Sequence, residues 1–147
     1  MELPPINFIA VLVAGLIPSI LGALWYGPLF EKPWLSSLGK TKAEMAPNNM
    51  ALTYGLALLM AMIVSFFLKL GIEISHRDVE AGKLVFTSFH TFKHGALHGA
   101  MVALTTVVPV IVSLSLFQKN SAKNILLNIT FWTVCFSIMM GILDAWI

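Results

Sequence analysis

Three histidines lead directly into a long uncharged run in residues 90–117, which read HTFKHGALHGAMVALTTVVPVIVSLSLF. About twenty residues at the end of this stretch lack any charged side chain. A helix rises about 1.5 Å per residue, so such a run can cross the roughly 30 Å hydrocarbon core of a bilayer. His90, His94 and His98 recur at intervals of four, which in a helix places them along one face. The stretch therefore predicts a membrane-spanning helix with a histidine stripe at one end.

The composition of the whole chain is that of a membrane protein. Of its 147 residues, 58% are hydrophobic and only 11% are charged, whereas a soluble domain has about 25% charged residues. Four apolar segments are long enough to span a bilayer, and they cover approximately residues 5–27, 48–70, 94–117 and 122–146. Because the connections are short, we expect a single all-α integral membrane domain over residues 1–147, built as a bundle of four transmembrane helices.

The connections carry two further structural expectations. Ser75 and Asp78 have the spacing of a capping box, and Val79 and Phe86 fall at helical intervals. They predict an amphipathic helical extension before the third span, either lying on the membrane or continuing into the span. Residues 31–47 carry several charges, a glycine and two prolines, and they predict a solvated loop.

Two charged residues near the ends of spans have ordinary surface roles in this interpretation. Lys69, at the end of the second span, can extend its ammonium group to the headgroup region. Asp144 lies beside Trp146 near the end of the fourth span. We therefore expect Asp144 to be a solvated carboxylate at the membrane surface.

Aromatic residues gather around a break that follows the first span. The string LGALWYGPLFEKPW contains a Gly-Pro pair, which interrupts helical hydrogen bonding. The members of this aromatic turn are Trp25, Tyr26, Pro28, Phe30 and Trp34. Trp and Tyr favour the headgroup level, so the turn can be part of an aromatic belt. Alternatively, it is a capping turn that closes one end of a cavity.

At this turn the chain resembles the uncharacterised bacterial membrane proteins catalogued as domain of unknown function 1761. Members have a Trp-Tyr-x-Pro turn followed by a Phe and a Trp, which correspond here to Trp25, Tyr26, Pro28, Phe30 and Trp34. The similarity covers nearly the whole chain in length and four-segment layout. The resemblance implies a four-helix membrane protein, brings no activity with it and does not include the histidine stripe.

Small residues recur on the faces of three predicted spans, where they allow neighbouring helices to approach closely. They are Gly15 and Gly22 in the first span, Ala57 and Ala61 in the second, and Gly95 and Gly99 in the third. Asn128 is the amide well inside the fourth span. We expect it to join two helices by hydrogen bonding, with a substrate contact as the alternative. Pro18 and Pro109 predict kinks.

Several classes of function find no support in the sequence. The net charge is +2 and comes from scattered residues, so there is no basic patch for nucleic acid. No hydrolase or metalloprotease motif occurs and no carboxylate pair lies within a span, so we do not expect an enzyme. No cofactor is expected. A divalent metal ion is the one candidate ligand, because histidines four residues apart can share a metal that another helix or subunit completes.

Two functions remain for such a protein. The leading one is a structural or accessory subunit that acts through helix contacts, because small-residue faces are frequent and charges within the spans are few. The alternative is a small transporter or channel for protons or metal ions whose path includes His90, His94 and His98. The same histidines can also form a hydrated row at the membrane surface.

The expected surroundings of the protein are a bilayer and other membrane subunits. We expect a multi-pass protein of the cell membrane, specifically a bacterial inner membrane, present as a homo-oligomer or within a membrane complex. Five lysines lie in the connections of one side, against four lysines and arginines on the other. This difference favours both termini on the side away from the cytoplasm.

Overall fold

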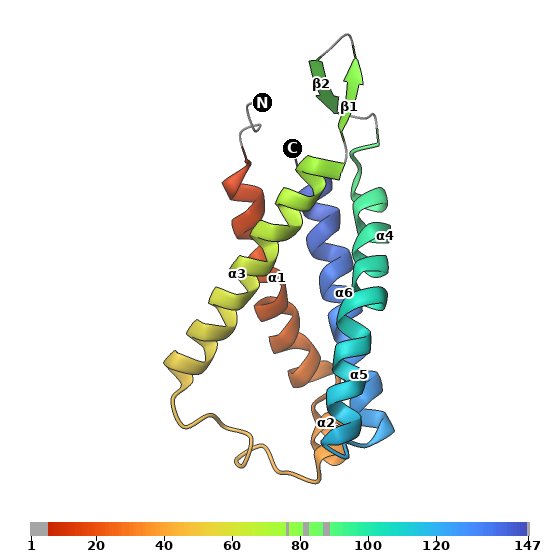
Figure 1. Cartoon of the computed structure of the whole chain (residues 1–147). Helices are drawn as coiled ribbons and strands as arrows, with labels where there is room; N and C mark the ends of the chain where they lie inside the picture. The colour runs from red at the N-terminus through yellow and green to blue at the C-terminus, as the bar shows by residue number, and fades with distance from the viewer. Residues whose placement is uncertain (1–5, 76, 81–82, 87–88, 147) are drawn as a thin grey trace.

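The computed structural model describes residues 6–75, 77–80, 83–86 and 89–146, and it is dominated by long helices (Figure 1). Four helical stretches are long and apolar enough to cross a membrane: Phe8–Leu29, Met50–Ser75, Phe92–Phe117 and Ala122–Ala145. The expected all-α fold with four spans is thus confirmed. The described ends of the chain lie at the same end of the bundle, together with the connection between the second and third spans (Figure 1).

The first span is the helix α1 (Phe8–Leu24), which continues through Pro18. Asn7 caps its start, where its side-chain oxygen accepts a hydrogen bond from the Ala10 amide at 3.1 Å. A π-helical turn, η1 (Trp25–Leu29), comes next, and within it Gly27 leaves the helical conformation with φ −104° and ψ −114°. The predicted break after the first span therefore lies in the aromatic turn.

A short helix, α2 (Glu31–Leu38), occupies the first half of the segment that was expected to be a loop. That expectation was wrong for these eight residues. Glu31 lies in the first turn, where a negative charge interacts favourably with the helix dipole. Gly39 ends the helix in the left-handed conformation with φ 62°, which glycine adopts without strain.

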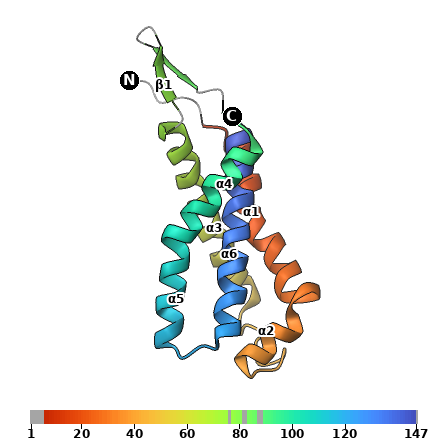
Figure 2. The same cartoon turned by 90° about the vertical axis from the view of Figure 1, so that its right-hand side faces the viewer.

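The second span, α3 (Met50–Ser75), is longer than predicted, and the segment after it is not a helix. Two short antiparallel strands, β1 (Arg77–Glu80) and β2 (Lys83–Phe86), form a hairpin (Figure 2). The expected helical extension before the third span is therefore wrong. The Ser75 hydroxyl does not cap a new helix, because it donates to the Gly71 carbonyl of α3 at 2.7 Å.

The third span is interrupted at its centre. It consists of α4 (Phe92–Val102), a π-helical turn η2 (Ala103–Val107) and α5 (Val108–Phe117). Pro109 lies just after the π-helical turn, at the start of α5. Because proline lacks an amide hydrogen, it cannot continue the normal ladder into the preceding turn. This irregularity lies where the sequence predicted the second kink.

The fourth span, α6 (Ala122–Ala145), packs against α4 and α1, and α1 also packs against α3. The buried apolar core where α1, α3 and α6 meet consists of Ala10, Val11, Ala14, Ile72, Met139, Met140 and Leu143. Towards the other end of the bundle, α3 diverges from α1 (Figure 1). Gly55 of α3 accordingly has no neighbouring atom where a Cβ would lie. The bundle is therefore tightly packed at the end of the two described termini and open at the end of α2.

Several of the predicted small residues make close helix contacts within the chain. A Cβ on Gly95 or Gly99 would collide with backbone atoms of α6, and one on Gly15 would collide with Met62 of α3. Gly22 faces the ring of Phe131. Ala61 is buried, whereas Ala57 is exposed.

Candidate functional site

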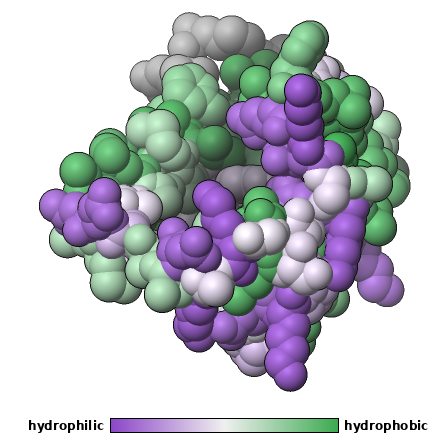
Figure 3. All heavy atoms as spheres, turned by 90° about the horizontal axis from the view of Figure 1, so that it is seen from below, coloured by the Kyte–Doolittle hydropathy of each residue, from purple (hydrophilic) through white to green (hydrophobic). Residues whose placement is uncertain are grey.

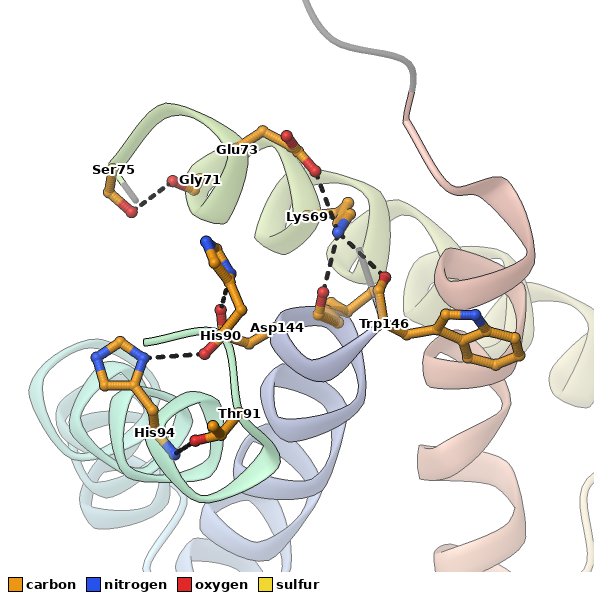
Figure 4. A network of polar contacts seen from close by, with 10 residues as sticks. Lys69, Gly71, Glu73, Ser75, His90, Thr91, His94, Asp144 and Trp146 are labelled. Atoms are coloured by element: carbon orange, nitrogen blue, oxygen red, sulfur yellow. Dashed lines mark hydrogen bonds and ion pairs between the residues drawn. The ribbon is translucent and has the colours of Figure 1, made fainter. Parts of the chain in front are cut away.

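Asp144 lies at the centre of a buried group of ionisable side chains, near the end of α6 (Figure 4). Its side chain is 0% exposed, and each of its two oxygens faces a different histidine. Oδ1 lies 2.9 Å from Nδ1 of His90, and Oδ2 lies 2.9 Å from Nδ1 of His94. One carboxylate therefore bridges two imidazole rings from another segment of the chain.

The start of α4 brings both histidines to this carboxylate. Thr91 caps the helix in an extended conformation, and its hydroxyl accepts a hydrogen bond from the His94 amide at 3.2 Å. His94 therefore lies in the first turn, while His90 precedes the cap and is outside the helix. Gly95 allows this approach, because a Cβ there would collide with Asp144 and with the Met140 carbonyl.

The three histidines do not form the single helical stripe that their spacing predicted. His94 and His98 share one face of α4, with ring centroids 4.4 Å apart. His90 lies outside α4, before the Thr91 cap, and contacts the same Asp144 carboxylate as His94. Its side chain is 7% exposed, whereas that of His94 is 27% exposed. His94 is thus the less enclosed of the two histidines that contact Asp144.

A buried ion pair from α3 lies beside the histidines (Figure 4). Lys69 and Glu73 are one helical turn apart, with 3.1 Å between Nζ and Oε1, and their side chains are 1% and 4% exposed. The Lys69 ammonium also donates to the carbonyls of Leu143 and Trp146, at 3.0 and 3.4 Å. It therefore satisfies carbonyl groups that the end of α6 leaves without helical partners.

The surface roles expected for Lys69 and Asp144 are therefore wrong. Both residues are near the ends of spans, as predicted, but α3, α4 and α6 converge there and exclude solvent from them. The i, i+4 spacing of Lys69 and Glu73 was the available signal for an ion pair. No local pattern indicated that Asp144 would meet the histidines, because they are about fifty residues apart in sequence. We call Lys69, Glu73, His90, His94 and Asp144 the ionic cluster.

The five side chains of the ionic cluster comprise one amine, two carboxyl groups and two imidazoles. Burial penalises charged side chains unless they are paired and hydrogen-bonded, and the contacts within the cluster provide such pairing. Within the described part of the chain, no three His, Cys, Asp or Glu residues are arranged to hold a metal ion.

The aromatic turn lies at the opposite end and packs on α6. The ring centroid of Tyr26 is 5.0 Å from that of Trp34 and 5.1 Å from that of Phe131. Trp25 packs on Phe30 at 4.6 Å. Tyr26 and Trp34 also line a cavity of about 930 Å³ between α1, α3 and α6. The aromatic turn therefore contributes two rings to the wall of this cavity.

A chain of hydrogen bonds fixes this turn to α6 and α2. The Tyr26 hydroxyl donates to Oδ1 of Asn128 at 2.7 Å, and the Asn128 amide donates to Asn124 at 3.0 Å. Asn124 in turn donates to the Ser37 hydroxyl of α2 at 3.2 Å. Asn128 thus joins two segments of the bundle through its amide, which is the interaction expected of it.

Tyr26→Phe is expected to lower the free energy of unfolding by about 1–2 kcal/mol, because the Asn128 oxygen loses its donor in a partly buried site. Tyr54→Phe is the matched control, since Tyr54 is 61% exposed on α3 and should change stability by less than about 0.5 kcal/mol. Unfolding in mixed detergent micelles, followed by circular dichroism, measures both. Equal stability of the Tyr26→Phe variant and the wild type would show that this hydrogen bond does not hold the turn.

Comparison with known proteins identifies a family. A family model described as "Protein of unknown function (DUF1761)" matches residues 9–143. The match covers nearly the whole chain, so the chain belongs to this family, as the aromatic turn suggested. No curated protein and no solved structure matches the chain significantly.

Proposed function

We propose that this member of the DUF1761 family is a small proton-linked membrane transporter, in which the ionic cluster takes up and releases the proton. The single observation that carries the proposal is the bridging of His90 and His94 by the buried carboxylate of Asp144. Ionisable side chains within membrane-spanning segments are costly, and they commonly mark ion or proton pathways. The proposed role is transport rather than catalysis.

The geometry supports a defined route for the proton. An ionised carboxylate only accepts hydrogen bonds, so both Nδ1 atoms would carry hydrogen and donate to Asp144. The other ring nitrogen of each histidine is then the acceptor for an incoming proton. His94 is the more exposed of the two and is the proposed point of entry. The imidazolium that forms would remain in contact with the Asp144 carboxylate, which stabilises it.

The arrangement of the bundle supports a transporter that is closed at one end. The ionic cluster joins α3, α4 and α6 at the tightly packed end, and the apolar core lies next to it. The large cavity begins beyond this core, with Met139 contributing to both. A change in the charge of the cluster would alter the contacts that hold the three helices together. We therefore propose that proton binding controls the opening of this end.

The accessory-subunit hypothesis has less support. Its main argument was the number of small-residue faces, yet Gly15, Gly95 and Gly99 contact other helices of the same chain. These faces are therefore not available for a partner protein. Self-association through other surfaces in the cell membrane remains part of the proposal. Metal transport is the less favoured form, because the described residues offer no group of three suitable ligands.

The test is proton flux into vesicles that contain the purified protein and a pH-sensitive dye. We expect wild-type protein to carry protons down an imposed gradient, and Asp144→Asn and His94→Gln to reduce the flux to that of protein-free vesicles. Lys93→Gln is the matched control, because Lys93 is exposed next to His94 on α4 and should leave the flux unchanged. Circular dichroism and elution volume establish that each variant is folded. Absence of wild-type flux, or full flux in folded Asp144→Asn, would favour the accessory role.

A further inference from the structure

We propose that the cavity at the α2 end of the bundle binds a lipophilic organic cation. The cavity has a volume of about 930 Å³ and lies between the diverging halves of α1 and α3, with α6 behind it. Pockets for drug-sized ligands have roughly 300–1,000 Å³. Seen from below, the molecule is hollowed at this end, with hydrophobic side chains around the hollow and hydrophilic ones near its rim (Figure 3). The inference concerns a separate site and does not depend on proton transport.

The lining of the cavity is rich in aromatic rings. The aromatic members of the lining are Tyr26, Trp34, Tyr54, Phe131 and Trp132. The faces of such rings carry partial negative charge, so they attract cations and disfavour anions. The contacts of Tyr26 with Trp34 and Phe131 make three of the rings one continuous wall. An organic cation can bury apolar groups against this wall while its charge interacts with the ring faces.

One carboxylate lies at the rim to complement the positive charge. Glu31 and Lys42 both line the cavity and form an ion pair at 3.0 Å. The Glu31 side chain is 32% exposed and is held by the first turn of α2, whereas the Lys42 side chain is 80% exposed. An exposed ion pair contributes little stability, about 0–1 kcal/mol. A bound cation can therefore replace Lys42 beside Glu31 at little cost.

The α3 wall of the cavity is only partly covered by the rest of the chain. It includes Met50, Tyr54 and Met60, which are all more than half exposed, and α3 is one of the four helices long and apolar enough to span a membrane. A molecule dissolved in the bilayer can thus enter between α1 and α3. A neutral lipid chain could fill the apolar volume but would not interact with Glu31. An anionic amphiphile would meet both the ring faces and this carboxylate.

The experiment compares two probes of nearly the same size and shape but opposite charge, tetraphenylphosphonium and tetraphenylborate. Equilibrium dialysis of each labelled ion against the wild-type protein in a neutral detergent, with protein-free micelles subtracted, measures binding. We expect saturable binding of the phosphonium and none of the borate at the same concentrations. Saturable binding of both ions with equal affinity, or of neither, would overturn the proposal.

Three charge variants localise the binding. Glu31→Gln is expected to weaken phosphonium binding by about 5- to 30-fold, in line with the loss of a partly desolvated charge partner. Lys42→Gln is expected to strengthen it by about 2- to 5-fold, because Glu31 no longer has a competing cation. Glu44→Gln is the matched control. Hydrogen bonds from the Thr41 side chain and backbone lower the pKa of Glu44, so this variant removes a carboxylate charge from the same connection outside the cavity lining.

The phosphonium affinities of the three charge variants distinguish binding at a specific site from a general effect of the protein's net charge. If all three variants shifted binding according to net charge alone, Glu44→Gln would weaken it as much as Glu31→Gln, and the assignment to the cavity would be wrong. Trp34→Leu provides a second variant that keeps every charge. It should weaken phosphonium binding without affecting the elution volume, because one ring of the wall is lost. Unchanged affinity in folded Trp34→Leu and Glu31→Gln would also overturn the proposal.

Discussion

Lys69→Met is expected to lower the free energy of unfolding by about 3–5 kcal/mol, because removing one partner of a buried ion pair is strongly destabilising. Glu73, whose side chain is 4% exposed, would lose the ammonium group that lies 3.1 Å from its carboxylate in the wild-type protein. The carbonyls of Leu143 and Trp146 would also lose the ammonium donor. Unfolding in mixed detergent micelles, monitored by circular dichroism at neutral pH, measures the change.

Two further variants show whether the effect comes from the buried ion pair. Replacing both residues in Lys69→Met, Glu73→Met should restore part of the lost stability, because two apolar side chains then replace the ion pair instead of one partner being removed from it. The two carbonyl hydrogen bonds stay lost, at about 1 kcal/mol each, so recovery should be incomplete. Lys93→Met, at an exposed lysine near the same end, should change stability by less than about 0.5 kcal/mol. A double variant less stable than Lys69→Met would contradict this account.

The membrane-spanning fold was predictable because its signal is local. Each span is a run of apolar residues longer than the bilayer requires, and the distances between spans leave little room for another domain. The break in the first span was predictable for the same reason, since Gly27 and Pro28 disturb the helix wherever it packs. The short elements α2 and the hairpin were missed. The composition of the α2 segment suggested a loop, and the helical periodicity of the hairpin segment suggested a helix. Short segments such as these carry weak sequence signals.

The ionic cluster was only partly predictable, because its chemistry depends on contacts between distant segments. The sequence drew attention to the histidines but placed His90, His94 and His98 on one helix, whereas the cap at Thr91 leaves His90 outside it. A carboxylate or lysine near the end of a span is normally solvated. Asp144 and Lys69 are buried only because three helices converge over them. The helices converge because they pack closely on one another. The spacing of small residues in the sequence suggests close packing but does not show which helix packs against which.

Close packing of α4 on α6 gives the second large effect: Gly99→Ala is expected to lower the free energy of unfolding by about 2–3 kcal/mol, and Gly99→Leu by more. The position of a Cβ on Gly99 already overlaps the Phe136 carbonyl group and the Ser137 Cα. These are backbone atoms of a helix and cannot rotate away. Even alanine, which normally stabilises a helix relative to glycine, should therefore push the two helices apart.

Gly55→Leu is the matched control, because nothing lies within 4 Å of the position that its Cβ would take on α3. This variant should keep or slightly increase stability in the same mixed-micelle unfolding experiment, since leucine is the better helix former. Because the Gly99 face is occupied by α6 of the same chain, Gly99→Ala should also leave the oligomer size unchanged in detergent. A Gly99→Ala variant as stable as the wild type but smaller in size-exclusion chromatography would place this face at a contact between subunits. In that case the helix contacts of an accessory subunit would explain the glycine pair better than packing within the bundle.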